Sequence, residues 1–208
     1  MNVDHVISSI EKSHNNKSSL TREVLQVKSL SGTKTRHLIN NLCSYKDKSL
    51  SYFEIGCYCG STMCSALYKN NIRAVGVDTW AVYEGDHKHS KILCEENAEI
   101  YADKSKIRFL TGSFDSINKT TLGKFNIFHF DVEKSNTFGE NVLKYYNKNF
   151  KDKFVYIRND WNDETVSKQT FKDIESMEYK ILFKNEVFTS TPFDSKWRNG
   201  VAIFLLEK

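Results

Sequence analysis

Acidic and amide side chains close two apolar runs of the sequence. Asp131 ends the run FNIFHFD, and Asn159 and Asp160 end the run KFVYIRND. If both runs are parallel strands, ligand-binding groups collect beyond their carboxyl ends, so we expect these three side chains at one edge of a sheet. A carboxylate there could remove a proton from a hydroxyl group, and carboxylate and amide oxygens also suit a hard cation such as Mg²⁺. The competing interpretation is structural, because Asp and Asn often cap helices and turns.

A glycine-containing turn precedes these runs, in the stretch SYFEIGCYCGSTMCSALYK. An apolar run ends at Gly56, Gly60 follows four residues later, and Ser61 opens a helix-compatible run. A strand, a tight glycine turn and a helix N-terminus in this order usually hold a ligand. The dinucleotide fingerprint G-x-G-x-x-G has a glycine where Tyr58 stands, and a tyrosine there would block a pyrophosphate. We therefore expect a nucleotide-type site that does not take a diphosphate, which argues against a NAD-dependent oxidoreductase.

Asp78 ends another apolar run, IRAVGVD, 22 residues after Gly56 (78 − 56 = 22). A carboxylate at the end of the second strand can accept hydrogen bonds from both hydroxyls of a ribose. A helix cap or a turn is the alternative use of this aspartate, but the spacing favours the ribose. Trp80 follows closely and could flank an adenine ring or simply belong to the core.

Strand and helix signals alternate through most of the chain. Residues 1–50 indicate a helical lead-in, in which SLTREVLQVKSL and TKTRHLINNLCS have apolar residues at helical spacing. Near-continuous apolar runs predict strands buried on both faces, at 51–56, 72–78, 106–112, 125–131 and 153–160. Helices are expected between them, at 61–69, 88–102, 136–149 and 164–176. The last two apolar runs, 179–190 and 199–208, have no helix between them and predict an antiparallel hairpin.

This order predicts one α/β domain over residues 1–208, with its core at 51–208. The expected architecture is a Rossmann-like, doubly wound, seven-stranded sheet, mostly parallel with an antiparallel C-terminal hairpin.

Composition argues against several other classes of protein. The chain has 30 basic and 26 acidic residues, a net charge of +4, and no long basic block, so nucleic-acid binding is not indicated. No apolar run approaches the ~20 residues of a membrane span, and the first residues lack the apolar core of a signal peptide.

The five cysteines are odd in number, and we interpret them as reduced thiols of a cytoplasmic protein. A homodimer is left open.

The sequence resembles the class I S-adenosylmethionine-dependent methyltransferases. FEIGCYCGST is similar to their E-x-G-x-x-x-G motif, and the final hairpin fits their seven-stranded sheet. Within that class the chain looks most like small-molecule O-methyltransferases that act on sugars and macrolides. The likeness covers roughly residues 30–208 and includes HLINNLC, DWNDETV and WRNGVAIFLLEK.

The resemblance implies S-adenosylmethionine as the cofactor and a set of residues that hold it. Glu54 would order the glycine loop and the ammonium end of the ligand, unless it is a strand-end carboxylate that faces water. Ser113 stands where the family often has an acidic residue against the adenine amino group. The expected cofactor-binding residues are Glu54, Gly56, Cys57, Tyr58, Gly60, Ser61, Asp78, Thr79, Trp80, Ser113, Phe114 and Asp131.

The resemblance also implies O-methylation of a hydroxylated small molecule such as a sugar. Related metal-dependent enzymes place an acid after the fourth strand and an Asp/Asn pair after the fifth, so Asp131, Asn159 and Asp160 are candidate ligands of Mg²⁺ or another divalent cation. Asp131 and Glu133 are the candidate catalytic residues. The segment DVEKS, however, departs from the family pattern, which leaves a catalytically degenerate cofactor-binding or interaction module as the alternative.

Basic residues near the expected mouth of the site permit an anionic acceptor, including a nucleotide or RNA. These residues are Arg36, Lys134 and Arg158.

Overall fold

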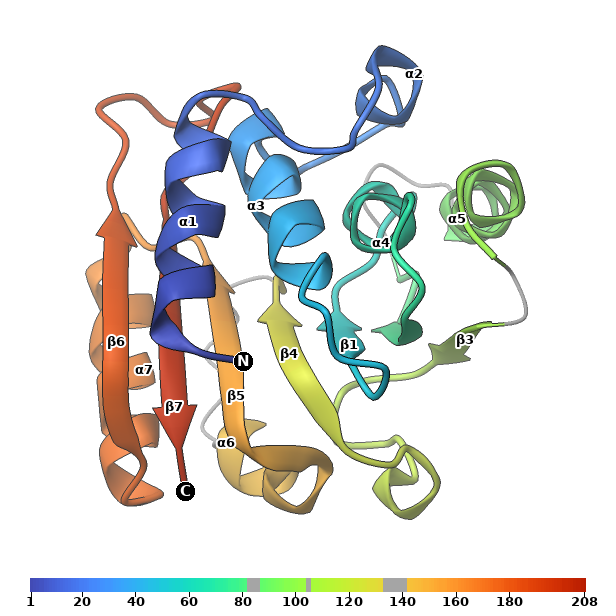
Figure 1. The fold of residues 1–208 in the computed structure, drawn as a ribbon. Helices are drawn as coiled ribbons and strands as arrows, with labels where there is room; N and C mark the ends of the chain where they lie inside the picture. The colour runs from blue at the N-terminus through green and yellow to red at the C-terminus, as the bar shows by residue number, and fades with distance from the viewer. Residues whose placement is uncertain (82–86, 104–105, 133–141) are drawn as a thin grey trace.

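Seven strands form one mixed sheet in the computed structural model, which describes residues 1–81, 87–103, 106–132 and 142–208 (Figure 1). The strands lie in the order β3-β2-β1-β4-β5-β7-β6. Their bounds are β1 Ser51–Ile55, β2 Arg73–Asp78, β3 Ile107–Thr111, β4 Phe125–Phe130, β5 Phe150–Asn159, β6 Lys180–Val187 and β7 Val201–Glu207. Within the described residues, β7 alone runs opposite to the other strands, and it pairs antiparallel with both β5 and β6. The predicted sheet with its antiparallel C-terminal hairpin is confirmed.

Helices of the lead-in and of the crossovers flank this sheet. Their bounds are α1 Val3–His14, α2 Arg22–Leu25, α3 Thr33–Cys43, α4 Ser61–Leu67, α5 His87–Tyr101, α6 Val142–Tyr145 and α7 Glu164–Ser176. The helices predicted at 61–69, 88–102 and 164–176 are confirmed, with small differences at their ends. The helix predicted at 136–149 is described only from Val142 onward, because residues 133–141 lie outside the described residues, and it ends early, at Tyr145, with a 3-10 turn over Asn147–Asn149.

The helix expected over residues 19–30 is reduced to the four residues of α2. Arg36 of α3 is buried and donates hydrogen bonds to the carbonyls of Val24, Leu25 (3.0 Å) and Val27 (3.5 Å). In a longer helix these carbonyls would accept from backbone N–H groups four residues further on. The guanidinium therefore takes the place of further helical bonds, and hydrophobic periodicity cannot reveal such a tertiary contact.

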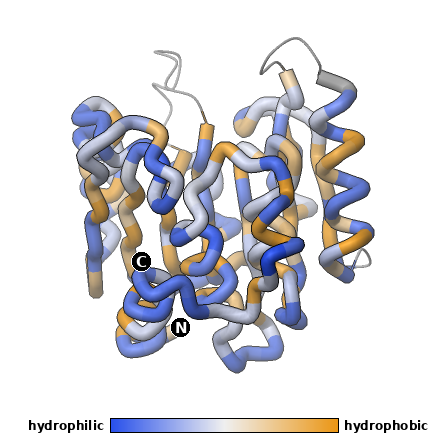
Figure 2. Tube along the Cα trace, turned by 90° about the horizontal axis from the view of Figure 1, so that it is seen from above, coloured by the Kyte–Doolittle hydropathy of each residue, from blue (hydrophilic) through white to orange (hydrophobic). Residues whose placement is uncertain are grey.

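Two hydrophobic cores lie on the two faces of the sheet. One core is covered by α1, α3, α4 and α5, and the other by α6 and α7 (Figure 1). Every residue of β1 and β4 is buried, as their continuous apolar runs predict. Hydrophilic and hydrophobic residues alternate along the helices in Figure 2, as expected of helices that bury one face. None of the described helices combines the length and apolar character needed to cross a membrane.

The loop between β6 and β7 is fixed against the start of α3. Thr33 donates its backbone N–H to the carbonyl of Ser195 (2.9 Å), and Lys34 donates to that of Lys196 (2.8 Å). A Cβ atom on Gly32 would lie 2.1 Å from the carbonyl oxygen of Lys196, so the two backbones meet where only glycine fits. The lead-in thus holds this loop at the edge of the sheet where the parallel strands end.

Candidate functional site

A cavity of about 380 Å³ lies at the carboxyl edge of the parallel strands. This volume is within the range of roughly 300–1,000 Å³ that small-molecule sites usually have. The walls come from the glycine loop after β1, from the ends of β2 to β5, from the β6–β7 loop and from the lead-in. Many of the predicted site residues line it together: Gly56, Tyr58, Asp78, Thr79, Trp80, Ser113, Phe114, Asp131 and Asp160.

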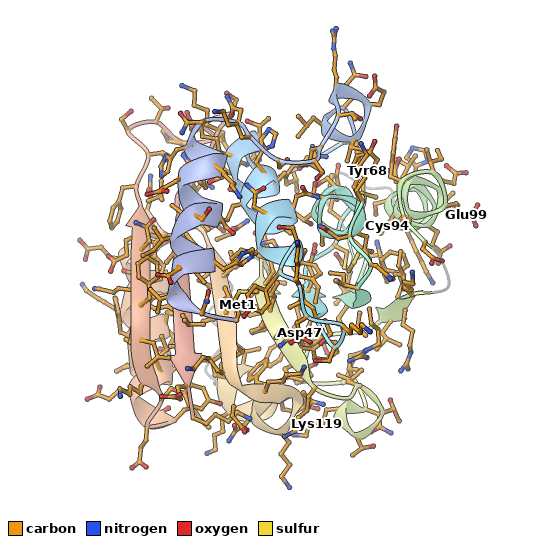
Figure 3. All side chains as sticks on the ribbon, in the orientation of Figure 1. Met1, Asp47, Tyr68, Cys94, Glu99 and Lys119 are labelled. Atoms are coloured by element: carbon orange, nitrogen blue, oxygen red, sulfur yellow. The ribbon has the colours of Figure 1, made fainter. Side chains whose placement is uncertain are left out.

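The two glycines of the loop after β1 are required by backbone shape and by close packing. Gly56 has a φ of +96°, and a Cβ atom there would lie 1.8 Å from the carbonyl oxygen of Asp131. Gly60 has a φ of +80° and caps α4, and its Cβ would lie 2.9 Å from Sγ of Cys94. Figure 3 marks Cys94 on α5. Both positions have the left-handed geometry that only glycine adopts without strain.

The Asp78 carboxylate organises this loop. Its Oδ2 accepts hydrogen bonds from the backbone N–H groups of Cys57 (2.7 Å) and Tyr58 (2.8 Å), and its Oδ1 accepts from the N–H of Trp80 (2.7 Å). A carboxylate has about four lone-pair sites, so one on Oδ1 is left for a ligand. The sequence did not predict that Asp78 holds the glycine loop in place, because the spacing of residues does not indicate this contact. Contact with a ribose stays a prediction, and it concerns one hydroxyl rather than two.

Glu54 is completely buried, so the interpretation that it faces water is wrong. Its Oε2 accepts a hydrogen bond from the Tyr52 hydroxyl (2.6 Å), and its Oε1 accepts from the hydroxyl of Thr62, in the first turn of α4. Glu54 is not among the residues that line the cavity. It ties β1 to α4 and so supports the glycine loop from below.

A hydrogen-bonded chain runs from Glu54 to Asp131 across three neighbouring strands. The His129 ring contacts the Tyr52 oxygen through Nδ1 (3.0 Å) and the Asn159 Oδ1 through Nε2 (3.3 Å). The Asn159 Nδ2 in turn donates to Oδ2 of Asp131 (2.6 Å). Glu54 and His129 stand opposite each other in the β1–β4 register, which no single segment of sequence reveals.

The donors and acceptors of this chain determine the charge of His129. The single hydroxyl proton of Tyr52 is used on Glu54, and the amide donor of Asn159 is used on Asp131. Both ring nitrogens of His129 thus face acceptors, an arrangement that favours the imidazolium form of the ring. Burial alone would lower the pKa of His129, but the Glu54 carboxylate 3.8 Å away, together with Asp131 and Asn159, raises that pKa above its usual value. His129 is thus a satisfied, fully buried histidine.

Asp131 is half-buried at the wall of the cavity. Burial raises the pKa of its carboxyl group to about 6, with Asp160 adding to the rise, while the charges of His129 and Arg158 oppose it. A carboxylate with this pKa is ionised at neutral pH and is a stronger base than an ordinary aspartate. Asp160 has a φ of +60°, and its Oδ1 accepts a hydrogen bond from Nδ2 of Asn199 (2.9 Å).

The three candidate metal ligands differ in their access to the cavity. Asp131 and Asp160 line it, whereas Asn159 is buried with its oxygen toward His129 and its nitrogen toward Asp131. As arranged, this trio does not fit a cation, because the amide oxygen of Asn159 points away from both carboxylates. In the part of the chain that the structure describes, no group of three or more His, Cys, Asp or Glu residues could hold a metal ion.

The far end of the cavity is formed by aromatic and polar residues near the ends of β2 and β3. Trp80 is buried, has a φ of +45° and donates its Nε1–H to the carbonyl of Tyr58 (3.2 Å). Phe114 is buried in the wall, and Ser113 is exposed and donates its hydroxyl to Oδ1 of Asp115 (2.5 Å). An acidic group therefore lies beside the serine that replaces the acid of the resembled family.

Besides Glu54, three predicted cofactor residues, Cys57, Gly60 and Ser61, are not among those that line the cavity. The Cys57 side chain is buried against the carbonyl of Val77 (3.7 Å), and the hydroxyl of Ser61 pairs with that of Ser29 (2.7 Å). Glu133, the second candidate catalytic residue, lies outside the described residues. Its role stays a prediction.

The interpretation that Arg36 and Arg158 bring positive charge to the mouth is wrong. Arg36 is buried against carbonyls of the lead-in, and Arg158 is buried with Nη1 on the carbonyl of Phe130 (3.0 Å) and its guanidinium 4.6 Å from the Phe130 ring. Lys134 lies outside the described residues. Among the described residues, the cation that lines the cavity is Arg198, in the β6–β7 loop, which the residue patterns did not single out.

Comparisons with known proteins agree on the fold. No protein-family model and no curated protein sequence matches the chain. Among solved structures, the proposed RNA methyltransferase PH1948 of Pyrococcus horikoshii matches with a TM-score of 0.62 at 14% identity, over 100% of this chain and 98% of that one. The precorrin-6y C5,15-methyltransferase of Geobacter metallireducens matches with a TM-score of 0.60 at 12% identity, over 88% and 91%.

The SAH-bound methyltransferase PaMTH1 of Podospora anserina matches with a TM-score of 0.57 at 12% identity, over 100% of this chain and 89% of that one. At such identities the likeness establishes a Rossmann-like fold that these methyltransferases share. The names of these neighbours indicate different methyl acceptors, RNA in one case and precorrin-6y in another.

Proposed function

We propose that this chain is an S-adenosylmethionine-dependent methyltransferase that methylates a hydroxyl oxygen of a small molecule, with sugars as one candidate class. The observation that carries the proposal is the convergence of the glycine loop, Asp78 and Asp131 on one cavity at the carboxyl edge of the sheet. Ligands of open α/β sheets bind at this edge. The fold shared with an SAH-bound methyltransferase supports the same assignment.

The residues around the cavity fit the parts of this cofactor. Phe114 and Trp80 offer apolar walls for an adenine, and the free lone pair on Oδ1 of Asp78 can accept a ribose hydroxyl. Asp131 offers a carboxylate at the end toward β4 and β5, where a sulfonium cation is favoured. When bound, S-adenosylmethionine supplies an activated methyl group.

Asp131 is the proposed general base. Asn159 holds its Oδ2, and this leaves Oδ1 to accept the proton of the acceptor hydroxyl. The oxygen of that hydroxyl would gain the methyl group, and SAH would be the leaving group. The imidazolium of His129 fixes the orientation of Asn159 by donating to its oxygen. The chain from Glu54 to Asn159 is therefore a support that positions the base, and it does not itself touch the acceptor.

Divalent-metal assistance is the remaining variant of this mechanism, although the present orientation of Asn159 does not suit a cation. One measurement distinguishes the metal-assisted mechanism from the metal-free one, namely methyl transfer before and after treatment with EDTA. We expect that EDTA leaves turnover unchanged. A loss that Mg²⁺ restores would show that the Asn159 amide turns around and that a metal acidifies the acceptor hydroxyl instead.

The test of the proposed function is methyl transfer from labelled S-adenosylmethionine to a panel of hydroxylated compounds. The Asp131→Asn variant should lose at least about a hundredfold in turnover, as loss of a general base typically does, while still binding SAH. Asp152→Asn is the matched control, because this exposed aspartate lies at the opposite end of β5. Equal turnover in the two variants would remove Asp131 as the base. SAH binding without transfer to any acceptor would favour the degenerate module.

All five cysteines are free and buried. We propose a cytoplasmic location, since reduced thiols persist in that compartment.

A further inference from the structure

Arg198 belongs to the end of the cavity that is left for the acceptor. Ser113 and Phe114 line the cavity after β3, at one side of the sheet, whereas Phe193 and Arg198 line it from the loop before β7. Since β2, β1, β4 and β5 separate β3 from β7, these two groups occupy opposite ends. The proposed cofactor residues fill the first end. The second end therefore receives the other substrate.

The loop that carries Arg198 is built to hold it in place. Arg198 and Asp194 exchange two backbone hydrogen bonds, of 2.8 and 2.9 Å, and the Asp194 carboxylate accepts from the N–H of Trp197 (2.7 Å). Trp197 is buried, and its ring lies 5.1 Å from that of His14. The loop is thus anchored in the lead-in as well as closed on itself.

Asn199 joins this loop to the predicted catalytic edge. Its Oδ1 accepts from the N–H of Phe193 (2.9 Å), and its Nδ2 donates to Oδ1 of Asp160 (2.9 Å). Phe193, Arg198 and Asp160 are therefore held in one frame beside Asp131. A preorganised frame reduces the ordering cost of binding a ligand.

The conformation and the partners of Arg198 are unusual. Its φ is +61°, in the left-handed region that a non-glycine residue adopts only when its surroundings hold it there, and such positions cluster at ligand-binding sites. Its guanidinium lies 4.6 Å from the centre of the Phe193 ring, and Phe193 is 66% exposed. Within the described part of the chain, no carboxylate forms an ion pair with Arg198 and no acceptor bonds its guanidinium.

The carboxylates of the same cavity, by contrast, already have donors. Asp131 accepts from Asn159, and Asp160 accepts from Asn199. This end of the cavity thus offers acceptors for a hydroxyl at Asp131 and a planar fork of five donors at Arg198. Such a fork matches the two oxygens of a carboxylate or of a phosphate.

We propose that Arg198 binds an anionic oxygen group of the acceptor, so that the substrate is a small hydroxylated carboxylate or phosphate ester. This inference rests on the proposed function. It narrows the acceptor class to compounds that carry both a hydroxyl and an oxyanion. Phe193 supports the guanidinium from one side and leaves its edge for the ligand.

The experiment compares neutral and anionic probes that share one scaffold. The pairs are catechol with 3,4-dihydroxybenzoate and glucose with glucose 6-phosphate, titrated into the SAH-free and the SAH-loaded protein by NMR. Arg198→Gln removes the charge. Lys196→Gln is the matched control in the same loop, because Lys196 is exposed and does not line the cavity. Thermal unfolding checks that both variants fold.

We expect an anionic probe to bind at least about tenfold more tightly than its neutral partner, because a charge-assisted bond is roughly twice as strong as a neutral one. Arg198→Gln should abolish this preference, and Lys196→Gln should keep it. No preference in either pair, or a preference that survives in Arg198→Gln, overturns the proposal. A selective loss of SAH affinity in Arg198→Gln also overturns it, since Arg198 would then hold the cofactor.

The SAH-free titration separates this result from a failure of the proposed function. If the wild-type protein does not bind SAH but still prefers the anionic probes through Arg198, the anion site stands and the methyltransferase assignment falls.

Discussion

Replacing Glu54 with glutamine tests whether a buried charge pair supports the base. The Glu54→Gln substitution keeps the size of the side chain, and its amide oxygen can still accept a hydrogen bond from Tyr52 or Thr62, so the change removes mainly the negative charge. His129 would then be a fully buried imidazolium without the counter-charge of Glu54. Breaking a buried ion pair by removing one partner costs about 3–5 kcal/mol of unfolding free energy. For a chain of this size that loss lowers Tm by about 6–20 °C.

The same substitution should invert the pH dependence of stability. In the wild-type protein the pKa of His129 is raised, so its contribution is fully present below the unfolded value of about 6.5 and is lost as the pH rises through the folded pKa. In Glu54→Gln, only Asp131 and Asn159 still oppose burial, so we expect the pKa of His129 to fall below its usual value. The variant should therefore lose stability as the pH falls below about 6.5.

The assay is urea denaturation followed by circular dichroism at pH 5.5 and pH 8. Glu207→Gln is the matched control, because Glu207 pairs with Lys153 (3.3 Å) at an exposed position, where loss of an ion pair costs at most about 1 kcal/mol. A Glu54→Gln variant as stable as this control, with the wild-type dependence on pH, would refute an ionised His129–Glu54 pair.

Three further predictions follow from the same contacts. Turnover should rise with pH through about 6 as Asp131 loses its proton, and a pH–rate profile that is flat between pH 5 and 7 would contradict its role as base. Gly56→Ala should lower the free energy of unfolding by more than about 3 kcal/mol, because the new Cβ meets the backbone carbonyl of Asp131. Gly123 has a similar φ, but its Cβ would meet only a side chain 3.3 Å away, so Gly123→Ala should cost about 1–2 kcal/mol in the same denaturation assay. Phe128→Ala should lower the free energy of unfolding by about 3–5 kcal/mol in calorimetry, since the Phe128 ring is fully buried between those of Phe53 and Phe150. A loss below about 1 kcal/mol would show that the core closes over the space that the ring leaves.

Local sequence patterns predicted the sheet and its glycine loop well. The strands are short apolar runs buried on both faces, and their order along the chain is enough to suggest the alternation with helices. Gly56 and Gly60 were identifiable because a glycine turn between strand and helix has a local signature. The strands and the glycine turn depend on residues that are close in the sequence, so a single sequence is enough to predict them.

Contacts between distant segments were beyond the reach of such patterns. The chain from Glu54 to Asp131 depends on the register of β1, β4 and β5, which sequence spacing does not fix. The orientation of Asn159 follows from its partners rather than from its place at a strand end. Arg198 has no motif around it, and it lines the cavity from a loop that is hydrogen-bonded to the start of α3, far away in the sequence.

A crystal structure of the protein grown with millimolar SAH tests the central claim most directly. We expect the adenine between Trp80 and Phe114, the ribose at Oδ1 of Asp78, and the sulfur toward Asp131, with Arg198 free of the cofactor. SAH bound elsewhere on the protein, or a cavity that stays empty at saturating ligand, would contradict it.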